Sequence, residues 1–130
     1  MIIVSEKNAP AIDVREPFKR KLKVLLSPAI HEGLESIAAG LSILPEGGMS
    51  DDHEHEEGEM FYVVKGSGKI KCGEEEEGLS AGTAVWVGPW TSHQLINTGK
   101  STLKILWVLS PPGREGLILE IAGGKQDEAL

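Results

Sequence analysis

The sequence predicts an all-β protein, either a sandwich or a barrel of short strands. Most of its apolar segments are four to nine residues long, rich in β-branched or aromatic residues, and bounded by Gly, Pro, Ser or Asn. They recur roughly every 8–16 residues, a spacing typical of strands joined by turns. Helical periodicity is nearly absent, and the 16 glycines and 7 prolines also indicate many turns.

Eight segments are expected to form strands. In chain order they are LKVLL (22–26), SIAAGLSIL (36–44), MFYVV (60–64), KIKC (69–72), TAVWV (83–87), HQLIN (93–97), TLKILWVL (102–109) and GLILEI (116–121). KGSGK at 65–69 and NTGKS at 97–101 have the composition of tight hairpin turns. We expect one domain over residues 1–122 and a C-terminal tail over 123–130, either frayed or a short helix.

The net charge of −7 comes from two short acidic pieces. Six acids lie within residues 51–59, and four more form EEEE at 74–77. EEEE lies between two glycines, which is typical of an exposed hairpin tip. The basic run FKRKLK (18–23) lacks interleaved aromatic residues, so a solvated face or an edge strand is expected rather than a nucleic-acid patch. We therefore expect no nucleic-acid partner.

The single cysteine and the first residues of the chain also indicate a cellular compartment. Cys72 is the single cysteine, which excludes an intrachain disulfide and favours a reducing environment. The first residues contain acids and an apolar run of only three residues, unlike a secretory signal, and no stretch approaches the roughly 18 apolar residues of a membrane span. We expect a soluble, cytoplasmic protein without a membrane partner.

The stretch DDHEHEEGE (51–59) carries the residues with the clearest chemistry. As strand residues, His53, His55 and Glu59 share one parity and would point the same way. The intervening Glu54 and Glu56 would point to solvent. Two imidazoles and a carboxylate suit a divalent transition metal. This pattern favours a metal site that needs one more ligand, and His93, at the start of another apolar segment, is a candidate.

Three imidazoles and one carboxylate suit iron, manganese, nickel, cobalt or zinc as divalent ions. In an octahedral shell they leave two positions open for a substrate. The sequence therefore predicts one divalent transition metal per chain, with the ligands His53, His55, Glu59 and His93.

The spacing of these residues resembles the two motifs of the cupin superfamily. Residues 47–66 read Gly47-x5-His53-x-His55-x3-Glu59-x6-Gly66, which agrees with the first motif at every position. Gly82, His93 and Asn97 agree with the second motif, G-x5-P-x-G-x2-H-x3-N. Two positions depart from it, because Pro89 comes one residue late and Trp90 replaces the second glycine. The resemblance implies a single double-stranded β-helix of the jelly-roll type.

Other residues are expected around the metal. Side chains that share the parity of Glu59 should face the cavity, large aromatic residues near the metal-bearing strands can form its wall, and an arginine after the strand 102–109 can hold a substrate carboxylate at the mouth. The candidate lining residues are Phe61, Val63, Trp90, Trp107 and Arg114.

The expected metal site favours a small anionic, oxygen-bearing ligand, because a divalent metal with one carboxylate ligand leaves about one positive charge uncompensated. Tyr62, Glu56 and Glu57 are weak candidates for proton transfer, so the catalytic acid or base stays unassigned. Three functions remain open. They are a dioxygenase-like enzyme, which we favour, a metal-dependent isomerase or lyase acting through an enediolate, and a non-catalytic cupin that binds a small ligand.

A homodimer is expected. Met60, Tyr62 and Val64 have the opposite parity to Glu59 and suit burial against a second subunit related by a two-fold axis.

Overall fold

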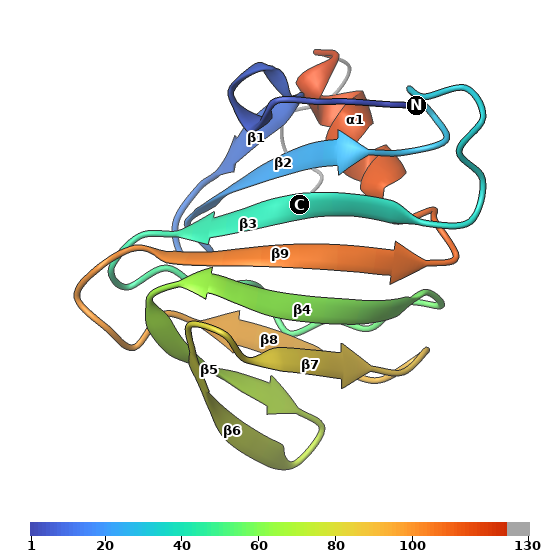
Figure 1. Ribbon diagram of the computed structural model, residues 1–130. Coiled ribbons are helices and arrows are strands. Elements are labelled where there is room, and N and C mark those ends of the chain that lie inside the picture. Colours follow the sequence, from blue (N-terminus) through green and yellow to red (C-terminus); the bar gives the residue numbers. More distant parts are fainter. Residues whose placement is uncertain (125–130) are drawn as a thin grey trace.

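The computed structural model describes residues 1–124 and contains two antiparallel sheets (Figure 1). Within these residues the elements are, in chain order, η1 (Glu6–Asn8), β1 (Ala11–Val14), β2 (Arg20–Leu26), β3 (Ala38–Leu44), β4 (Gly58–Lys65), β5 (Ser67–Cys72), β6 (Glu75–Ser80), β7 (Ala84–Val87), β8 (His93–Ile96), β9 (Leu103–Ser110) and α1 (Glu115–Ala122). Seven of the eight expected segments are strands, with bounds shifted by one or two residues. Strands β1 and β6 were not expected.

The two sheets enclose the core. The larger sheet has the order β1-β2-β3-β9-β4-β7 and the smaller has the order β6-β5-β8. Val63 and Ile105 of the larger sheet and Ile70 and Leu95 of the smaller one are at most 4% exposed and belong to one apolar cluster. Alternation along each strand places these residues between the layers.

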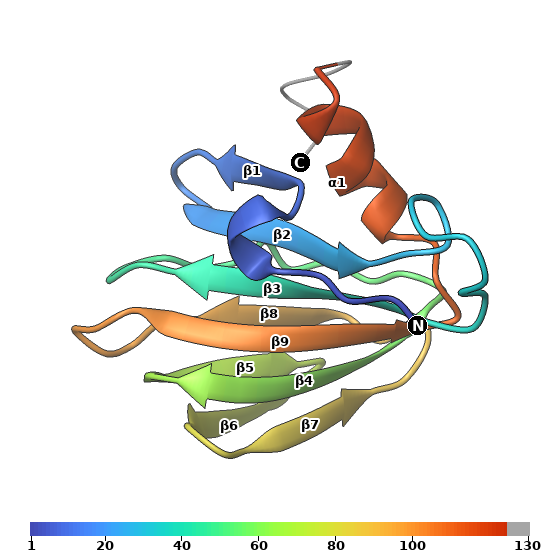
Figure 2. The ribbon, with the colours of Figure 1, turned by 45° about the horizontal axis from the view of Figure 1, so that its top comes forward.

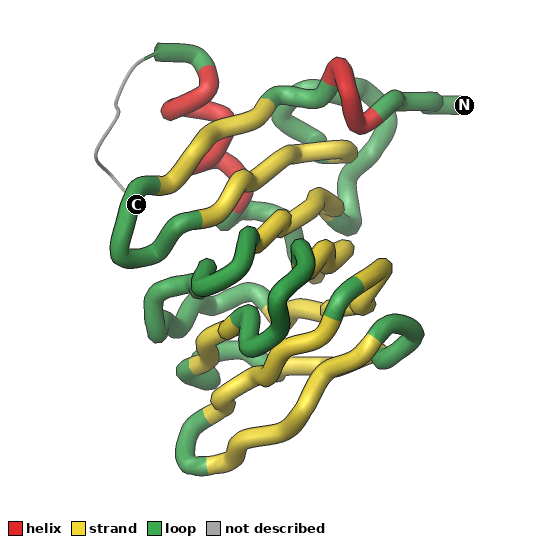
Figure 3. The backbone as a smooth tube through the Cα atoms, turned by 90° about the vertical axis from the view of Figure 1, so that its left-hand side faces the viewer, coloured by secondary structure: helices red, strands yellow, loops and turns green. Residues whose placement is uncertain are grey.

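Helix α1 covers the part of the larger sheet that lies beyond the smaller one. It packs against β1 and β2, and Figures 2 and 3 show it over that end of the sheet. Our expectation of a strand over 116–121 was therefore wrong. A short apolar run such as LILEI fits a strand or a buried helix equally well. Here the inner face of β1 and β2 needs cover, and Ile118 supplies it from the helix. Residues 125–130 of the expected tail lie outside the described part of the chain.

Two expected hairpin turns instead connect the sheets. KGSGK follows β4 in the larger sheet and leads into β5 in the smaller one, while NTGKS leads from β8 back to β9. Neither pair of strands forms a ladder, so both hairpin assignments were wrong. Gly66 has φ +87°, and a side chain there would overlap the backbone of Thr102. The glycine therefore allows the chain to pass from β4 to β5 in close contact with the backbone before β9.

The basic run FKRKLK does not form an edge strand. Strand β2 lies between β1 and β3, and Arg20 is buried with 7% exposure. The acidic run EEEE behaves as expected in one respect, since its residues are exposed, but Glu75, Glu76 and Glu77 belong to strand β6 rather than to the turn.

Asn97, the last residue of the second motif, stabilises the connection from β8 in the smaller sheet to β9 in the larger one. It is 4% exposed, and its Nδ2 donates to the carbonyls of Leu44 (2.9 Å), Pro45 (3.0 Å) and Ser101 (3.0 Å). Its Oδ1 accepts from the backbone N–H of Gly99 at 2.9 Å. Asn97 therefore satisfies buried backbone groups of three segments at once.

Neither helix within residues 1–124 has the length and apolar character that crossing a bilayer requires.

Candidate metal centre

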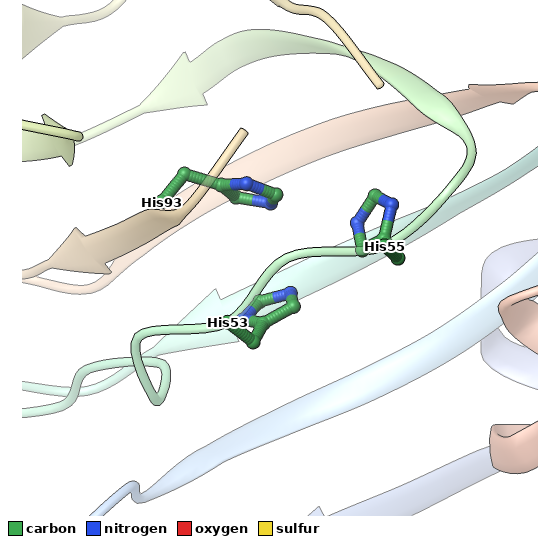
Figure 4. Close-up of side chains that lie close together, drawn as sticks. All are labelled: His53, His55 and His93. Carbon is green, nitrogen blue, oxygen red and sulfur yellow. The ribbon is translucent and has the colours of Figure 1, made fainter. Parts of the chain in front are cut away.

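Three histidines from two segments meet inside the molecule. His53 and His93 form an isolated antiparallel bridge, in which each backbone N–H donates to the other residue's carbonyl at 3.1 and 2.9 Å. His55 follows in the same segment, and Figure 4 shows the three rings converging. One potential ligand atom from each ring lies within 4.8 Å of the others. His53 and His55 come from the loop before β4 rather than from a strand, so their expected strand setting was wrong.

Backbone carbonyls fix the orientation of all three rings. In each case Nδ1 donates to a carbonyl two residues away: Asp51 for His53 (2.9 Å), Glu57 for His55 (2.9 Å) and Thr91 for His93 (2.8 Å). A proton on Nδ1 leaves Nε2 as the ring nitrogen available to a metal. Carbonyl partners of this kind hold imidazole ligands in one tautomer and orientation.

Glu59 of β4 lies beside two of these rings. Its Oε1 is 3.0 Å from Nε2 of His55 and 3.4 Å from Nε2 of His93. Because Nδ1 of His55 already donates to a carbonyl, the contact at 3.0 Å requires a second proton on that ring. Without a metal, the cluster is therefore held together by an ion pair between the His55 imidazolium and the Glu59 carboxylate.

The pKa values follow from these contacts. Burial lowers the pKa of His55, but the hydrogen bond and charge of Glu59 outweigh it and raise the pKa above 6.5. Burial raises the pKa of Glu59, but His55 and His93 outweigh it and hold the pKa below 4.5. Burial lowers the pKa of His53 below 6.5, since the backbone bond to Asp51 compensates only in part.

His93 provides the test of whether a metal fits. Its ring is 2% exposed, and its Nε2 has no hydrogen-bond partner among the described residues. Its Nδ1 already donates to Thr91, and its Nε2 faces Oε1 of Glu59 at 3.4 Å without a well-aligned hydrogen bond, which is an unfavourable arrangement for a buried polar atom. A cation between them satisfies both groups. The donor set of three imidazoles and one carboxylate therefore fits a divalent transition metal.

A cavity of about 80 Å³ adjoins the histidines. Its walls are largely apolar and include Phe61, Trp107 and Ile118. Gly40 of β3 makes room for Trp107, because a side chain at this position would overlap the indole ring. The volume is small beside the roughly 300–1,000 Å³ of typical sites for drug-sized ligands, so a compact ligand is favoured.

The structure separates the expected lining residues into two groups. Phe61, Trp107 and Arg114 line the cavity. Val63 is fully buried in the core and does not line it, because the side chain lies farther along β4 among apolar residues. Trp90 is 64% exposed and borders a separate outer groove instead. The expectation that Val63 and Trp90 line the cavity was wrong.

Trp90 keeps a backbone conformation suited to the glycine of the cupin motif. Its φ is +57°, which is costly for a residue with a side chain. Its backbone N–H donates to the carbonyl of His55 at 2.8 Å. The turn before His93 thus has a left-handed residue despite the substitution, and it supports the segment that carries His55.

Three charged cavity residues were missed as site residues from the sequence: Arg20, Asp51 and Glu115. Alternation along β2 gave a signal for the first, because Arg20 has the same parity as the apolar Leu22 and Val24. Asp51 has the same parity as His53 and His55, but its place in a run of six acids did not single it out, and the expected strand over 116–121 gave no environment for Glu115. Among the acids of the loop, Glu54 and Glu56 are exposed as expected, whereas Glu57 is buried.

Comparison with known proteins identifies the family. Residues 40–109, more than half of the chain, match the family described as "Cupin domain". The chain belongs to the cupin family. This cupin is 30% identical over 92 residues to the uncharacterized protein MJ1618 of Methanocaldococcus jannaschii, a match that covers 70% of this chain and 73% of the relative.

Solved cupin structures share the fold. A predicted oxalate decarboxylase from Thermotoga maritima has a TM-score of 0.74 and 22% identity, covering 85% of this chain and all (100%) of that one. The polyketide cyclase RemF from Streptomyces resistomycificus has a TM-score of 0.73 and 21% identity, covering 87% of this chain and 82% of that one. The two antiparallel sheets, together with similarity to a solved cupin that is described as a double-stranded β-helix (TM-score 0.62), confirm the double-stranded β-helix expected from the sequence.

Proposed function

We propose that this cupin is a metal-dependent enzyme that acts on a small anionic, oxygen-bearing molecule, with oxygen chemistry of the dioxygenase type. The observation that carries this proposal is the partnerless, buried Nε2 of His93 beside two other imidazoles and a carboxylate. A structural role alone leaves this nitrogen without a partner, whereas a metal ligand requires it free.

His53, His55 and His93 would hold the metal through Nε2, and Glu59 would complete the set. When bound, a divalent metal supplies Lewis acidity and a template for chelation and, if it is iron, access to oxygen chemistry. The proton between His55 and Glu59 must leave before both can act as ligands. The backbone carbonyls that bind Nδ1 keep the rings in place during this exchange.

The rest of the cavity limits what can react. Phe61, Trp107 and Ile118 exclude water from one side of the site, and the small volume favours a ligand of few heavy atoms. The similarity to a predicted oxalate decarboxylase supports the class of small acids. Fold similarity by itself does not choose a reaction, because one scaffold hosts many chemistries.

One observation favours isomerase or lyase chemistry as a second candidate. Asp51 and Glu115 are carboxylates in the cavity wall. They are better placed for proton transfer than Tyr62, which is 41% exposed on the outer face. A reaction through an enediolate needs such a group, and Asp51 is the better candidate because Glu115 already accepts from Ser27 Oγ and the Gly113 N–H, each at 2.6 Å.

The test is reconstitution of metal-free protein with each of the five divalent metals, followed by assay against small hydroxy and oxo acids with and without oxygen. Oxygen uptake with iron supports the first candidate, and anaerobic turnover supports the second. Stabilisation by a ligand without turnover under any metal indicates a non-catalytic binding protein. The variant His93→Ala should abolish each of these effects, whereas His31→Ala should not, because His31 lies outside the cluster. Failure to bind any of these metals contradicts the proposal.

We also propose that two copies pair through the outer face of β4 and β7. Tyr62, Val64 and Trp86 are 41%, 46% and 60% exposed there, and Met60 lies opposite Trp86 in the ladder. Apolar residues gathered in this way suit a two-fold interface. Light scattering should give twice the monomer mass, and Trp86→Glu should halve it. A monomeric wild type at micromolar concentration contradicts the dimer.

A further inference from the structure

Two arginines from distant parts of the chain reach the same cavity. Arg20 begins β2, and Arg114 immediately precedes α1. Both line the cavity that adjoins the three histidines. Two guanidinium groups in one largely apolar enclosure repel each other unless an anion lies near both. The cavity therefore contains two cationic side chains in addition to the proposed metal ligands.

Arg20 is only partly satisfied by the protein. It is 7% exposed. Its Nη1 donates to the carbonyl of Phe18 at 2.9 Å and, more weakly, to that of Met49 at 3.5 Å, and its Nη2 is 3.4 Å from Oδ1 of Asp51. A guanidinium has five N–H groups. These contacts use three of them, so donors remain for a ligand in the cavity.

Arg114 has no ion-pair or hydrogen-bonding partner for its side chain within residues 1–124. It is half-buried, so the lack of an anionic partner is more costly than on the surface. Burial lowers the pKa of Arg20, Asp51 opposes this shift, and Arg114 adds to it, which agrees with the two cations lying close together. The structure thus leaves a cationic group at the cavity without its counter-ion.

None of the carboxylates that line the cavity pairs with Arg114 within residues 1–124, and each contacts another group instead. Glu59 pairs with His55 at 3.0 Å. Glu115 accepts hydrogen bonds from Ser27 Oγ and from the Gly113 N–H. Asp51 contacts Arg20 through its Oδ1. Arg114 also borders the outer groove with Glu54, Glu56 and Glu57, but it forms no ion pair with any described residue, so a ligand carboxylate in the cavity can serve as its counter-ion.

We propose that Arg20 and Arg114 form a carboxylate clamp, and that the ligand of this cupin is a compact carboxylic acid with a second oxygen function. The clamp holds the carboxylate, and the second oxygen, a hydroxyl or oxo group, points to the histidine cluster. This orientation rests on the proposed metal site, but the clamp itself does not. Guanidinium groups bind carboxylates with paired, directional hydrogen bonds.

The cavity narrows the class further. A volume of about 80 Å³ accommodates a molecule of few heavy atoms, and the walls near Leu22, Leu109 and Ile118 are apolar. A short 2-hydroxy or 2-oxo acid with a small alkyl group fits these walls, because its alkyl end replaces water at an apolar surface.

The experiment measures binding of three matched probes by calorimetry, with and without bound metal. Lactate carries both functions, lactamide has the same size without the charge, and propionate lacks the hydroxyl. Arg114→Met removes the charge and keeps most of the aliphatic stem, and Arg15→Met is the control because Arg15 is exposed and outside the cavity. Arg20→Lys keeps a charge at a buried position where loss of the charge endangers folding.

Lactate should bind more tightly than lactamide, and Arg114→Met should weaken lactate roughly 10- to 100-fold, the value of a hydrogen bond to a charged partner. The variant should leave lactamide unchanged, Arg20→Lys should weaken lactate less, and Arg15→Met should change nothing. Lactate and propionate should differ only in the metal-loaded protein. If that difference is absent but the effect of Arg114→Met persists, the metal proposal fails and the clamp stands. Equal binding of lactate and lactamide, or an unchanged affinity in Arg114→Met, overturns the clamp.

Discussion

Replacement of His93 by alanine should remove most of the stabilisation of this cupin by divalent metals. In the folded protein the Nε2 of His93 is buried and has no hydrogen-bond partner within residues 1–124. A metal that binds there stabilises only the folded state, because the three histidines come together only after folding. Metal-induced stabilisation therefore reports directly on the proposed cluster.

The expected size follows from binding linkage. At a free metal concentration 100 times the Kd, binding adds about 2.7 kcal/mol to the free energy of unfolding. A chain of 130 residues unfolds with an entropy of about 0.27 kcal/mol per kelvin, so Tm should rise by about 10 °C. Loss of a residue that only orients a ligand weakens metal binding by up to about 100-fold, which is a conservative value for loss of His93 itself. The rise should then fall to about 1–2 °C.

Calorimetric melts of each variant, with and without metal, provide the assay. The difference within one variant cancels the packing that His93→Ala removes. His31→Ala is the matched control, since His31 lies outside the cluster and accepts a bond from the Ser27 N–H at 3.2 Å. The control should keep the full rise in Tm. An equal rise in His93→Ala and wild type would refute the proposed ligand set, as would loss of the rise in His31→Ala.

Three further outcomes are expected. Asn97→Ala should lower the free energy of unfolding by about 1–3 kcal/mol, because buried carbonyls lose their donor. The isosteric Asn97→Asp should lower it more, because a carboxylate would face those carbonyls. Urea titration measures both variants, and an unaffected aspartate variant contradicts the role of Nδ2. Trp90→Gly should have a free energy of unfolding about 1 kcal/mol higher than that of Trp90→Ala. Both variants lose the indole, but only glycine relieves the strain of the left-handed backbone conformation at this position. Equal stability of the two variants in urea titration would contradict this strain. As pH rises above 6.5, the metal-free protein should lose stability, because the raised pKa of His55 gives a contribution that is complete below 6.5 and is lost as the pH passes its folded-state value. The lowered pKa of His53 opposes this decline only within about one pH unit above 6.5, where the unfolded ring is still partly protonated, and the stabilisation by metal should grow as His55 gives up its proton. Glu59→Gln should remove the decline, and a metal-free protein whose urea midpoint rises with pH above about 7.5 would contradict the assignment.

Most residues of the candidate site could be predicted from local sequence patterns, namely motif spacing and alternation along strands. The motif spacing named His53, His55, Glu59 and His93, and the structure brings three imidazoles together with the carboxylate beside two of them. Period-two alternation placed Phe61 toward the cavity and Tyr62 outside. The anchoring of each Nδ1 to a carbonyl two residues away depended on loop geometry that residue types do not determine.

By itself, the sequence determined the strand-rich fold, the family and the residues of the candidate metal site, because these depend on side-chain alternation and on spacing along one chain. Only the tertiary structure decided that 116–121 is helical, that KGSGK crosses between sheets and that Arg20 is buried. Each of these depends on which surface lies opposite. The inner face of β1 and β2 extends beyond the smaller sheet, and covering it places α1, and with it Arg114, at the same cavity as Arg20. Residues 94 positions apart in the chain that line one cavity leave no local signature, so the proposed clamp could be inferred only from the fold.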